Sequence, residues 1–318
     1  MKHSKINILT NRGETVSAMA PVIISASRAT DIPAFYSDWF FNRLEKGYVV
    51  WRNPFNGANS YVSFSDTRFI VFWSKNPAPL LPHLQALQER GIGCYIQFTL
   101  NDYVRDALEP NVPSLQHRID TFKQLVERLG PGSVVWRFDP LLLTDSITIE
   151  DLLRRIGAIG DQLAGYSEKL VFSFADISSY RRVPVNLQNS GIKYREWDEA
   201  SMIEFASRLS EMNTRRWKYT LSTCAEHIDL EQFGIEHNRC IDPLLIARLK
   251  GDDKALTDFL ASAKRDPGQR KLCGCILSKD IGSYNTCAHG CVYCYANTSP
   301  AQAAINRGHH NPLSETIV

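Results

Sequence analysis

Short β-rich runs alternate with amphipathic segments along most of this 318-residue chain. The first pattern is typical of strands and the second of helices. Their alternation favours a parallel sheet with helices outside it, because parallel strands need long crossover connections. The predicted strands are 22–25, 48–51, 69–73, 94–99, 133–138, 170–174 and 219–222, with an eighth near 275–279, and the predicted helices are 34–46, 80–90, 115–129, 149–163, 199–215 and 300–307.

Eight strand-and-connector units fit a closed ring, so we predict an α/β fold in which residues 1–318 form a single TIM-like (β/α) barrel. A doubly wound open sheet would produce the same alternation and is the alternative. The connector between the seventh and eighth strands is too long for an ordinary loop. We therefore expect a cysteine-bearing insertion at 223–275, followed at 276–318 by a C-terminal loop and helix.

Charge and hydropathy limit the classes of partner. The chain has 36 Lys and Arg residues against 34 Asp and Glu residues, so no overall field attracts DNA or a membrane surface. A local basic pocket could still hold a nucleic acid. The first residues lack the apolar core of a secretory signal, and no apolar run is long enough to span a bilayer. We expect a cytoplasmic protein with reduced thiols and no membrane partner.

Polar residues follow each of the first seven predicted strands. The carboxyl ends of parallel strands form the active face of such folds, and the Arg and Lys residues there suggest an anionic ligand group. Taken singly, each residue could instead cap a helix or hold an arginine. Among the acids at these positions, the candidates for a catalytic role are Asp139, Asp176 and Glu226.

Five of the eight cysteines lie between positions 273 and 294, which indicates metal chemistry in a reduced compartment. Three of them, Cys287, Cys291 and Cys294, form a C-x3-C-x2-C loop in which Gly290 permits a tight backbone. Three thiolates on a four-iron cluster would leave one iron without a protein ligand. Structural zinc, completed by His289 or a remote cysteine, is the competing interpretation.

The remaining cysteines divide into one isolated thiol and a set of four. Cys94 lies in an apolar strand and is expected to be a buried small hydrophobe. We predict that the other four bind a second metal centre, either a second [4Fe–4S] cluster or zinc, with unpaired structural thiols as the alternative. These four are Cys224, Cys240, Cys273 and Cys275.

The triplet spacing resembles that of radical S-adenosylmethionine enzymes, and Tyr293 resembles the aromatic residue that packs near the adenine there. Nearly the whole chain resembles an uncharacterised bacterial family with a radical-SAM-like cysteine cluster at its C-terminus. Ala29 departs from that family's pattern, where a second arginine stands. The matching segments are 25–35, 53–56, 71–77, 136–140, 224–226, 240–242 and 280–284.

The resemblance implies a [4Fe–4S] cluster that cleaves bound S-adenosylmethionine to a 5′-deoxyadenosyl radical. It also implies a one-electron donor such as flavodoxin or ferredoxin, and a small-molecule or nucleotide substrate that the sequence does not identify. Ordinary members carry the cluster loop after their first strand, whereas here it follows the last. A closed barrel explains this as a circular permutation, because the last strand then neighbours the first.

In that permuted order, the end of strand 22–25 would contact the amino group of S-adenosylmethionine. The cofactor-binding candidates are Ser25, Ser27, Arg28 and Asp31 at that strand, Lys75 and Arg137 for the carboxylate, Gln97 for the ribose and Tyr293 for the adenine. The alternative function is a non-radical zinc or iron–sulfur protein with a nucleotide or nucleic-acid ligand. A nucleic-acid repair enzyme similar to the photoproduct lyases is a weaker possibility, since no basic stripe is present.

Overall fold

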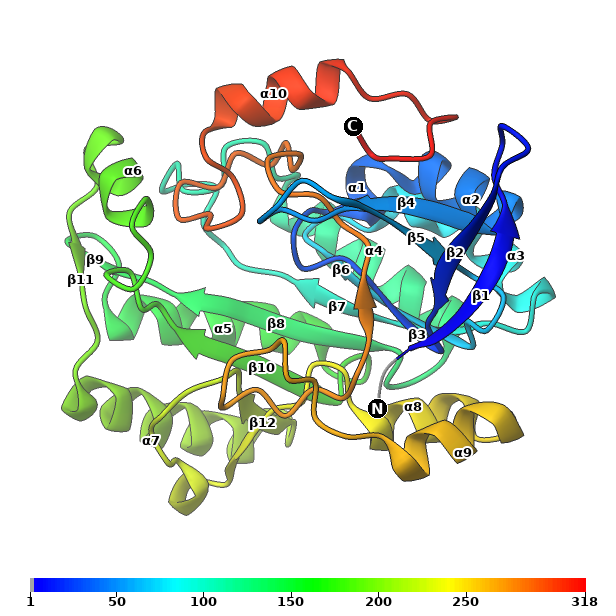
Figure 1. Ribbon diagram of the computed structural model, residues 1–318. Helices are drawn as coiled ribbons and strands as arrows, with labels where there is room; N and C mark the ends of the chain where they lie inside the picture. The colour runs from blue at the N-terminus through cyan, green and yellow to red at the C-terminus, as the bar shows by residue number, and fades with distance from the viewer. Residues whose placement is uncertain (1–2) are drawn as a thin grey trace.

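The computed structural model describes residues 3–318 and shows an α/β fold built around a parallel sheet of eight strands (Figure 1). All neighbouring strands in this sheet run parallel. In spatial order they are β13 (Ile235–His237), β12 (Thr220–Thr223), β10 (Lys169–Phe174), β8 (Val134–Leu141), β7 (Gly93–Thr99), β6 (Phe69–Ser74), β3 (Ile23–Ala26) and β14 (Lys279–Asp280).

The strands are buried on both faces, as apolar runs in a parallel sheet require. Phe69, Ile70, Val71 and Phe72 of β6 are fully inaccessible to solvent, as is Trp136 of β8. Figure 1 shows α4 and α5 behind the central strands. The three long helices each have a side-chain N-cap: Ser114 on α4 (Leu115–Leu129), Thr148 on α5 (Ile149–Leu163) and Asp198 on α7 (Glu199–Arg216).

Shorter elements complete the connections. The helices are α1 (Ile32–Phe35), α2 (Ser37–Lys46), α3 (Leu84–Glu89), α6 (Val183–Asn189), α8 (Pro243–Lys250), α9 (Lys254–Ser262) and α10 (Pro300–Gly308), with 3₁₀ turns η1 (Ala78–His83) and η2 (Glu231–Phe233). The strands β9 (Leu143–Thr144) and β11 (Tyr194–Arg195) form a small antiparallel pair. Within residues 3–318, none of the helices combines the length and apolar character needed to span a bilayer.

The prediction that 48–51 forms a strand of the parallel sheet is wrong. This segment, β4 (Tyr48–Arg52), belongs to a separate four-stranded sheet with β1 (Ser4–Leu9), β2 (Thr15–Ala20) and β5 (Asn59–Ser63). It pairs antiparallel with β5 across a short turn, with Val49 opposite Val62. The polar residues after it therefore follow a strand of the second sheet, although the end of β4 lies near β14, because Trp51 Nε1 donates to the Gly282 carbonyl at 3.1 Å.

The other predicted strands are confirmed as members of one large parallel sheet, and the eighth is the short β14. This last strand pairs with β3, with Lys279 opposite Ile24 and Asp280 opposite Ser25. The adjacency expected from the permuted order is thus observed. A closed barrel is not shown, because within the described residues β13 and β14 remain the two edges of the sheet. We call the gap between them the seam.

Helix packing against α7 gives a first test of the fold. A methyl group on Gly160 of α5 would lie 2.5 Å from Cζ2 of Trp217. That ring cannot easily move, because it stacks on Tyr219 and its Nε1 donates to Asp161 at 2.8 Å. We expect Gly160→Ala to lower the free energy of unfolding by about 1–3 kcal/mol through overpacking, as measured by chemical denaturation.

Gly157, one turn earlier on the same helix, is the matched control. A methyl group there would meet the mobile end of Arg216 at 2.9 Å. Because that side chain can move aside, helix propensity should dominate, and Gly157→Ala should leave stability unchanged or raise it by up to about 1 kcal/mol. Equal effects of the two substitutions would contradict the packing described.

Candidate functional site

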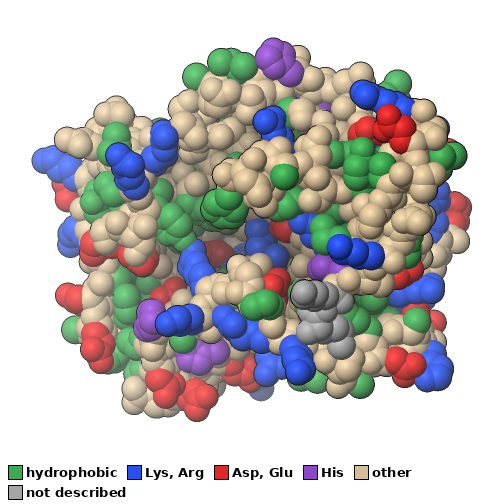
Figure 2. Space-filling model, viewed as in Figure 1, with side chains coloured by type: hydrophobic (Ala, Val, Ile, Leu, Met, Phe, Trp, Pro, Cys, Tyr) green, Lys and Arg blue, Asp and Glu red, His purple; other side chains and the backbone are tan. Residues whose placement is uncertain are grey.

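The residues predicted to act together lie beyond the carboxyl ends of the parallel strands, where the chain passes from β14 into the cysteine triplet. The space-filling view shows this face of the molecule hollowed near its middle, with Lys and Arg side chains around part of the hollow (Figure 2). This is the edge at which parallel α/β folds bind ligands. The contacts there are organised by three buried or half-buried acids.

Asp280 of β14 joins the last strand to the end of β3. Its carboxylate accepts hydrogen bonds from Ser25 Oγ at 2.9 Å, Ser27 Oγ at 2.7 Å and the Arg28 backbone at 2.8 Å. The following Gly282 leaves room for this arrangement, since a methyl group on it would lie 1.8 Å from Ser27 Oγ. Both serines are therefore oriented by the protein itself, and their predicted contact with a cofactor stays a prediction.

Asp31 connects three segments. It caps α1 by accepting from the Ala34 amide at 2.9 Å, and it accepts from Ser74 Oγ at 2.7 Å and the Lys75 amide at 2.8 Å at the end of β6. It also lies 2.7 Å from Nε2 of His289 in the triplet loop. Nε2 of His289 is therefore engaged by Asp31. Only Nδ1 of His289 could serve as the fourth ligand if the triplet cysteines bound zinc.

Glu109 is the third acid, and no sequence pattern singles it out because it lies in a loop between β7 and α4. Its Oε1 is 2.7 Å from Lys75 Nζ, and Tyr293 donates to the same oxygen. Burial works to raise the pKa of Glu109, but the charges of Lys75 and Arg118 outweigh it and hold that pKa below its usual value. Lys75 also donates to Tyr293 at 3.0 Å, so two of its three donors are used.

The triplet cysteines are brought together in a tight loop, in which Gly290 has a φ of +69° and the Cys294 amide donates to the Cys291 carbonyl at 3.1 Å. Burial raises the pKa of Cys287 to about 12 and also raises the pKa values of Cys291 and Cys294. The charge of Lys75 opposes this at Cys291 and Cys294. The loop therefore holds three half-buried thiols, two of which lie near one cation.

Backbone amides lie near two of these sulfurs. Those of Ala296 and Asn297 act to lower the pKa of Cys294, and those of His289 and Asp31 act to lower that of Cys287, against the larger effect of burial. Amides near sulfur stabilise thiolates and tune iron–sulfur clusters. The donor set therefore fits a cluster bound by three cysteines. Within residues 3–318, however, no three His, Cys, Asp or Glu side chains surround one point as ligands of a single metal ion do.

The second set of cysteines comes together at the seam. Cys224 follows β12, Cys240 follows β13, and Cys273 and Cys275 precede β14. The sulfurs of Cys224 and Cys240 are 3.4 Å apart. Cys275 is close enough to Cys240 and Cys273 that these two neighbours raise the pKa of its thiol. The structure thus makes one string of the four thiols that the sequence grouped by count and position.

Two arginines lie beside this string and close to Trp73. The guanidinium carbons of Arg28 and Arg137 lie 5.0 and 5.4 Å from the centre of the Trp73 ring. Arg137 Nη1 donates to Cys240 Sγ at 3.2 Å. Burial works to lower the pKa of Arg28, but the charges of Asp280, Cys275 and Cys240 outweigh it and raise that pKa. Both guanidinium groups are thus positive charges beside the thiols.

The predicted catalytic acids lie near one another. Asp139 is paired with Arg137 and accepts from Ser173, whereas Asp176 is exposed to solvent. Burial, and then the charges of Asp139 and Asp176, raises the pKa of Glu226 to about 7. Glu226 also accepts from the Phe174 amide at 3.0 Å. Their catalytic role stays a prediction.

Gln97 connects Arg137 to the backbone at Cys240. Its Nε2 donates to the Cys240 carbonyl at 2.9 Å, and its Oε1 accepts from Arg137 Nη1 at 3.2 Å. The side chain therefore positions the arginine beside the four-thiol string. A contact with a ribose, as the resemblance implies, stays a prediction.

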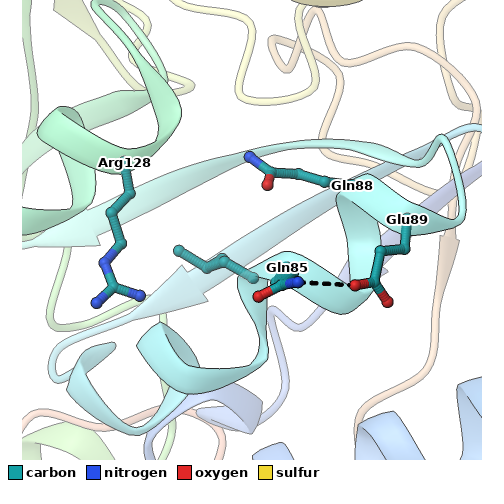
Figure 3. Close-up of a pocket in the computed structure, with 5 residues that line it drawn as sticks. Gln85, Gln88, Glu89 and Arg128 are labelled. Atoms are coloured by element: carbon teal, nitrogen blue, oxygen red, sulfur yellow. Dashed lines mark hydrogen bonds between the residues drawn. The ribbon is translucent and has the colours of Figure 1, made fainter.

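A pocket of about 550 Å³ lies elsewhere, on the outer helical layer (Figure 3). Arg128 reaches from α4 toward α3, where Gln85 Nε2 donates to Glu89 Oε1 at 2.8 Å one turn away. These helices precede β7 and β8, so the pocket is not at the carboxyl ends of the strands. None of its lining residues belongs to the predicted site.

Comparison with protein families places the chain in one of them. The model of a domain of unknown function, DUF1848, matches residues 23–296, which include most of the main sheet and both cysteine sets. The chain therefore belongs to the DUF1848 family, whose description assigns no activity. A comparison with curated proteins finds no match.

The buried pair of Lys75 and Glu109 provides a test of the site's electrostatics. We expect Glu109→Gln to lower the free energy of unfolding by about 3–5 kcal/mol, because it leaves the ammonium group buried without its counter-charge. Lys75→Met should have a similar effect, because it leaves the carboxylate unpaired. Chemical denaturation monitored by tryptophan fluorescence measures both.

The double variant decides whether the pair acts as described. Once both charges are removed, no uncompensated ion remains, so Lys75→Met with Glu109→Gln should be destabilised by clearly less than the sum of the two single effects. Strictly additive effects would show that the two charges do not interact.

Proposed function

We propose that this protein is an iron–sulfur enzyme of the radical S-adenosylmethionine type, with a [4Fe–4S] cluster held by Cys287, Cys291 and Cys294. The observation that supports the proposal is the triplet loop beyond the carboxyl end of β14, where the chain gathers three half-buried thiols and Lys75 lies near two of them. When bound, the cluster and S-adenosylmethionine together would supply one-electron cleavage of the sulfonium to a 5′-deoxyadenosyl radical.

The chain's own residues would bind and orient the nucleotide. Lys75 retains one free donor after its contacts with Glu109 and Tyr293, and this donor suits the carboxylate of the methionine part. Arg137, the other carboxylate candidate, is already committed to Asp139 and Gln97. Lys75 is therefore the stronger of the two.

The sheet supports the proposal by its strand order. Because β14 lies beside β3, the triplet loop emerges next to the segment that carries Ser25, Ser27 and Asp31. A cofactor held at the triplet would face these residues across adjacent strand ends. The fully buried strands beneath them would exclude water from below.

A non-radical metal protein is the second candidate. In a zinc version, the triplet would need a fourth ligand, and His289 could supply Nδ1, since its Nε2 contacts a carboxylate as the second nitrogen of metal-bound histidines does. Within residues 3–318, however, no three His, Cys, Asp or Glu side chains surround one point as zinc ligands do, and we therefore favour the cluster.

Anaerobic turnover tests the proposal. The full-length protein, reconstituted with iron and sulfide, is mixed with dithionite and S-adenosylmethionine, and 5′-deoxyadenosine is measured by liquid chromatography. We expect formation of 5′-deoxyadenosine and methionine, and loss of both in Cys291→Ala. Cys94→Ala is the matched control, because this thiol lies inside β7 and should leave product formation unchanged. No 5′-deoxyadenosine from an iron-loaded wild-type protein would end the proposal.

Binding of S-adenosylmethionine tests the role of Lys75 separately. Loss of a charge-assisted hydrogen bond should weaken binding about tenfold in Lys75→Met, measured by anaerobic calorimetry on iron-loaded protein. Since this substitution also affects stability, the comparison is made at a temperature where circular dichroism shows both proteins folded. Unchanged affinity would remove Lys75 from the binding site.

A further inference from the structure

We propose that Cys224, Cys240, Cys273 and Cys275 bind a second metal centre through four thiolates, at the seam between β13 and β14. The ligand is a thiophilic centre, either zinc or an iron–sulfur cluster, which share the same thiolate chemistry. This proposal is independent of the function proposed for the triplet.

The topology is the first argument. Four thiols reach one place from three separate connections: the ends of β12 and β13 and the segment leading into β14. These connections meet at the seam, where β13 and β14 are not paired with each other by backbone hydrogen bonds. Instead, the Ile276 amide donates to the Ile241 carbonyl at 3.2 Å, and the Ile241 amide donates to Cys275 Sγ at 3.2 Å. Ligation of all four thiols would hold the three connections together.

The surroundings of the sulfurs are the second argument. Cys240 Sγ accepts from Asn238 Nδ2 and from Arg137 Nη1, both at 3.2 Å. With the Ile241 amide on Cys275, three different donors are aimed at two sulfurs. Neutral thiols are weak acceptors, whereas metal-bound thiolates are regularly stabilised by such donors.

Charge balance is the third argument. Zinc with four thiolates carries a net charge of −2, and so does an oxidised four-iron cluster with four thiolates. Arg28 and Arg137 place two positive charges beside the string, and both lie close to the Trp73 ring. Moreover, the buried Nη2 atom of Arg28 has no hydrogen-bond partner within residues 3–318. A buried donor without an acceptor is costly, and an anionic sulfur centre would supply the acceptor.

A disulfide between Cys224 and Cys240 is the competing use of these thiols, since their sulfurs are only 3.4 Å apart. It would consume two of the four sulfurs and remove their negative charge. Arg28 would then keep its unpartnered donor, and Cys273 and Cys275 would have no role. Binding of zinc, or transfer of a preformed cluster, involves no oxidation: the four thiols release their protons to solvent as the metal–sulfur bonds form.

The experiment isolates this site by removing the other. The variant Cys287→Ala/Cys291→Ala/Cys294→Ala is prepared anaerobically, and its zinc, iron and sulfide contents are measured with its visible spectrum. About one zinc per chain supports a mononuclear centre, and about four iron and four sulfide per chain support a cluster. Adding Cys240→Ala should abolish the bound metal, whereas adding Cys94→Ala, the isolated thiol, should leave it unchanged.

Several results would overturn the proposal. One is a folded triplet variant that retains no metal through desalting after exposure to zinc, or to iron and sulfide. Metal content unaffected by Cys240→Ala is another, and a Cys224–Cys240 disulfide in the anaerobic protein is a third. If Cys240→Ala does not fold, Cys273→Ser, at the outer end of the string, must show the same loss. Because the triplet is absent throughout, failure of the radical proposal would not change these outcomes.

Discussion

The arrangement of the site depends on two carboxylates that join the end of the chain to its beginning. Asp280 gathers the donors of Ser25, Ser27 and the Arg28 amide, and Asp31 holds His289 of the triplet loop. Each contact spans about 250 positions in the sequence. Because a buried carboxylate is stable only when its oxygens are satisfied, these bonds fix the triplet loop against β3. Every other feature of the site is built on that attachment.

Each group of cysteines lies beside positive charge that is itself balanced by an acid. Lys75 faces the triplet and pairs with Glu109, while Arg137 faces the four-thiol string and pairs with Asp139. The acids keep the cations charged inside the protein, and the cations favour thiolate over thiol. This ordering of acid, cation and sulfur offsets part of the cost of placing negative charge on buried sulfur. Because the acids and cations are paired with one another, few of their donors and acceptors are free to bind a ligand.

The sequence predicted the long helices and most of the parallel strands because their patterns are local. Capped amphipathic stretches such as α4 and α5, and the apolar run of β6, need no information from elsewhere in the chain. It could not assign β4 to the second sheet, because a strand's partner depends on tertiary contacts. It missed β13, whose three residues form no apolar run. In the site, the cysteine sets were visible from spacing, whereas Glu109 was not, since a lone loop acid has no distinguishing pattern.

The pairing of β14 with β3 has a consequence for how the chain is made. During synthesis β3 leaves the ribosome early, and its partner on one side, β6, follows soon afterwards. The other side waits for residues 279–280, which are translated near the end. For most of translation the nascent protein therefore carries an unpaired strand edge, the kind of surface that associates with other chains. This edge would stay open to chaperones until residues 279–280 emerge.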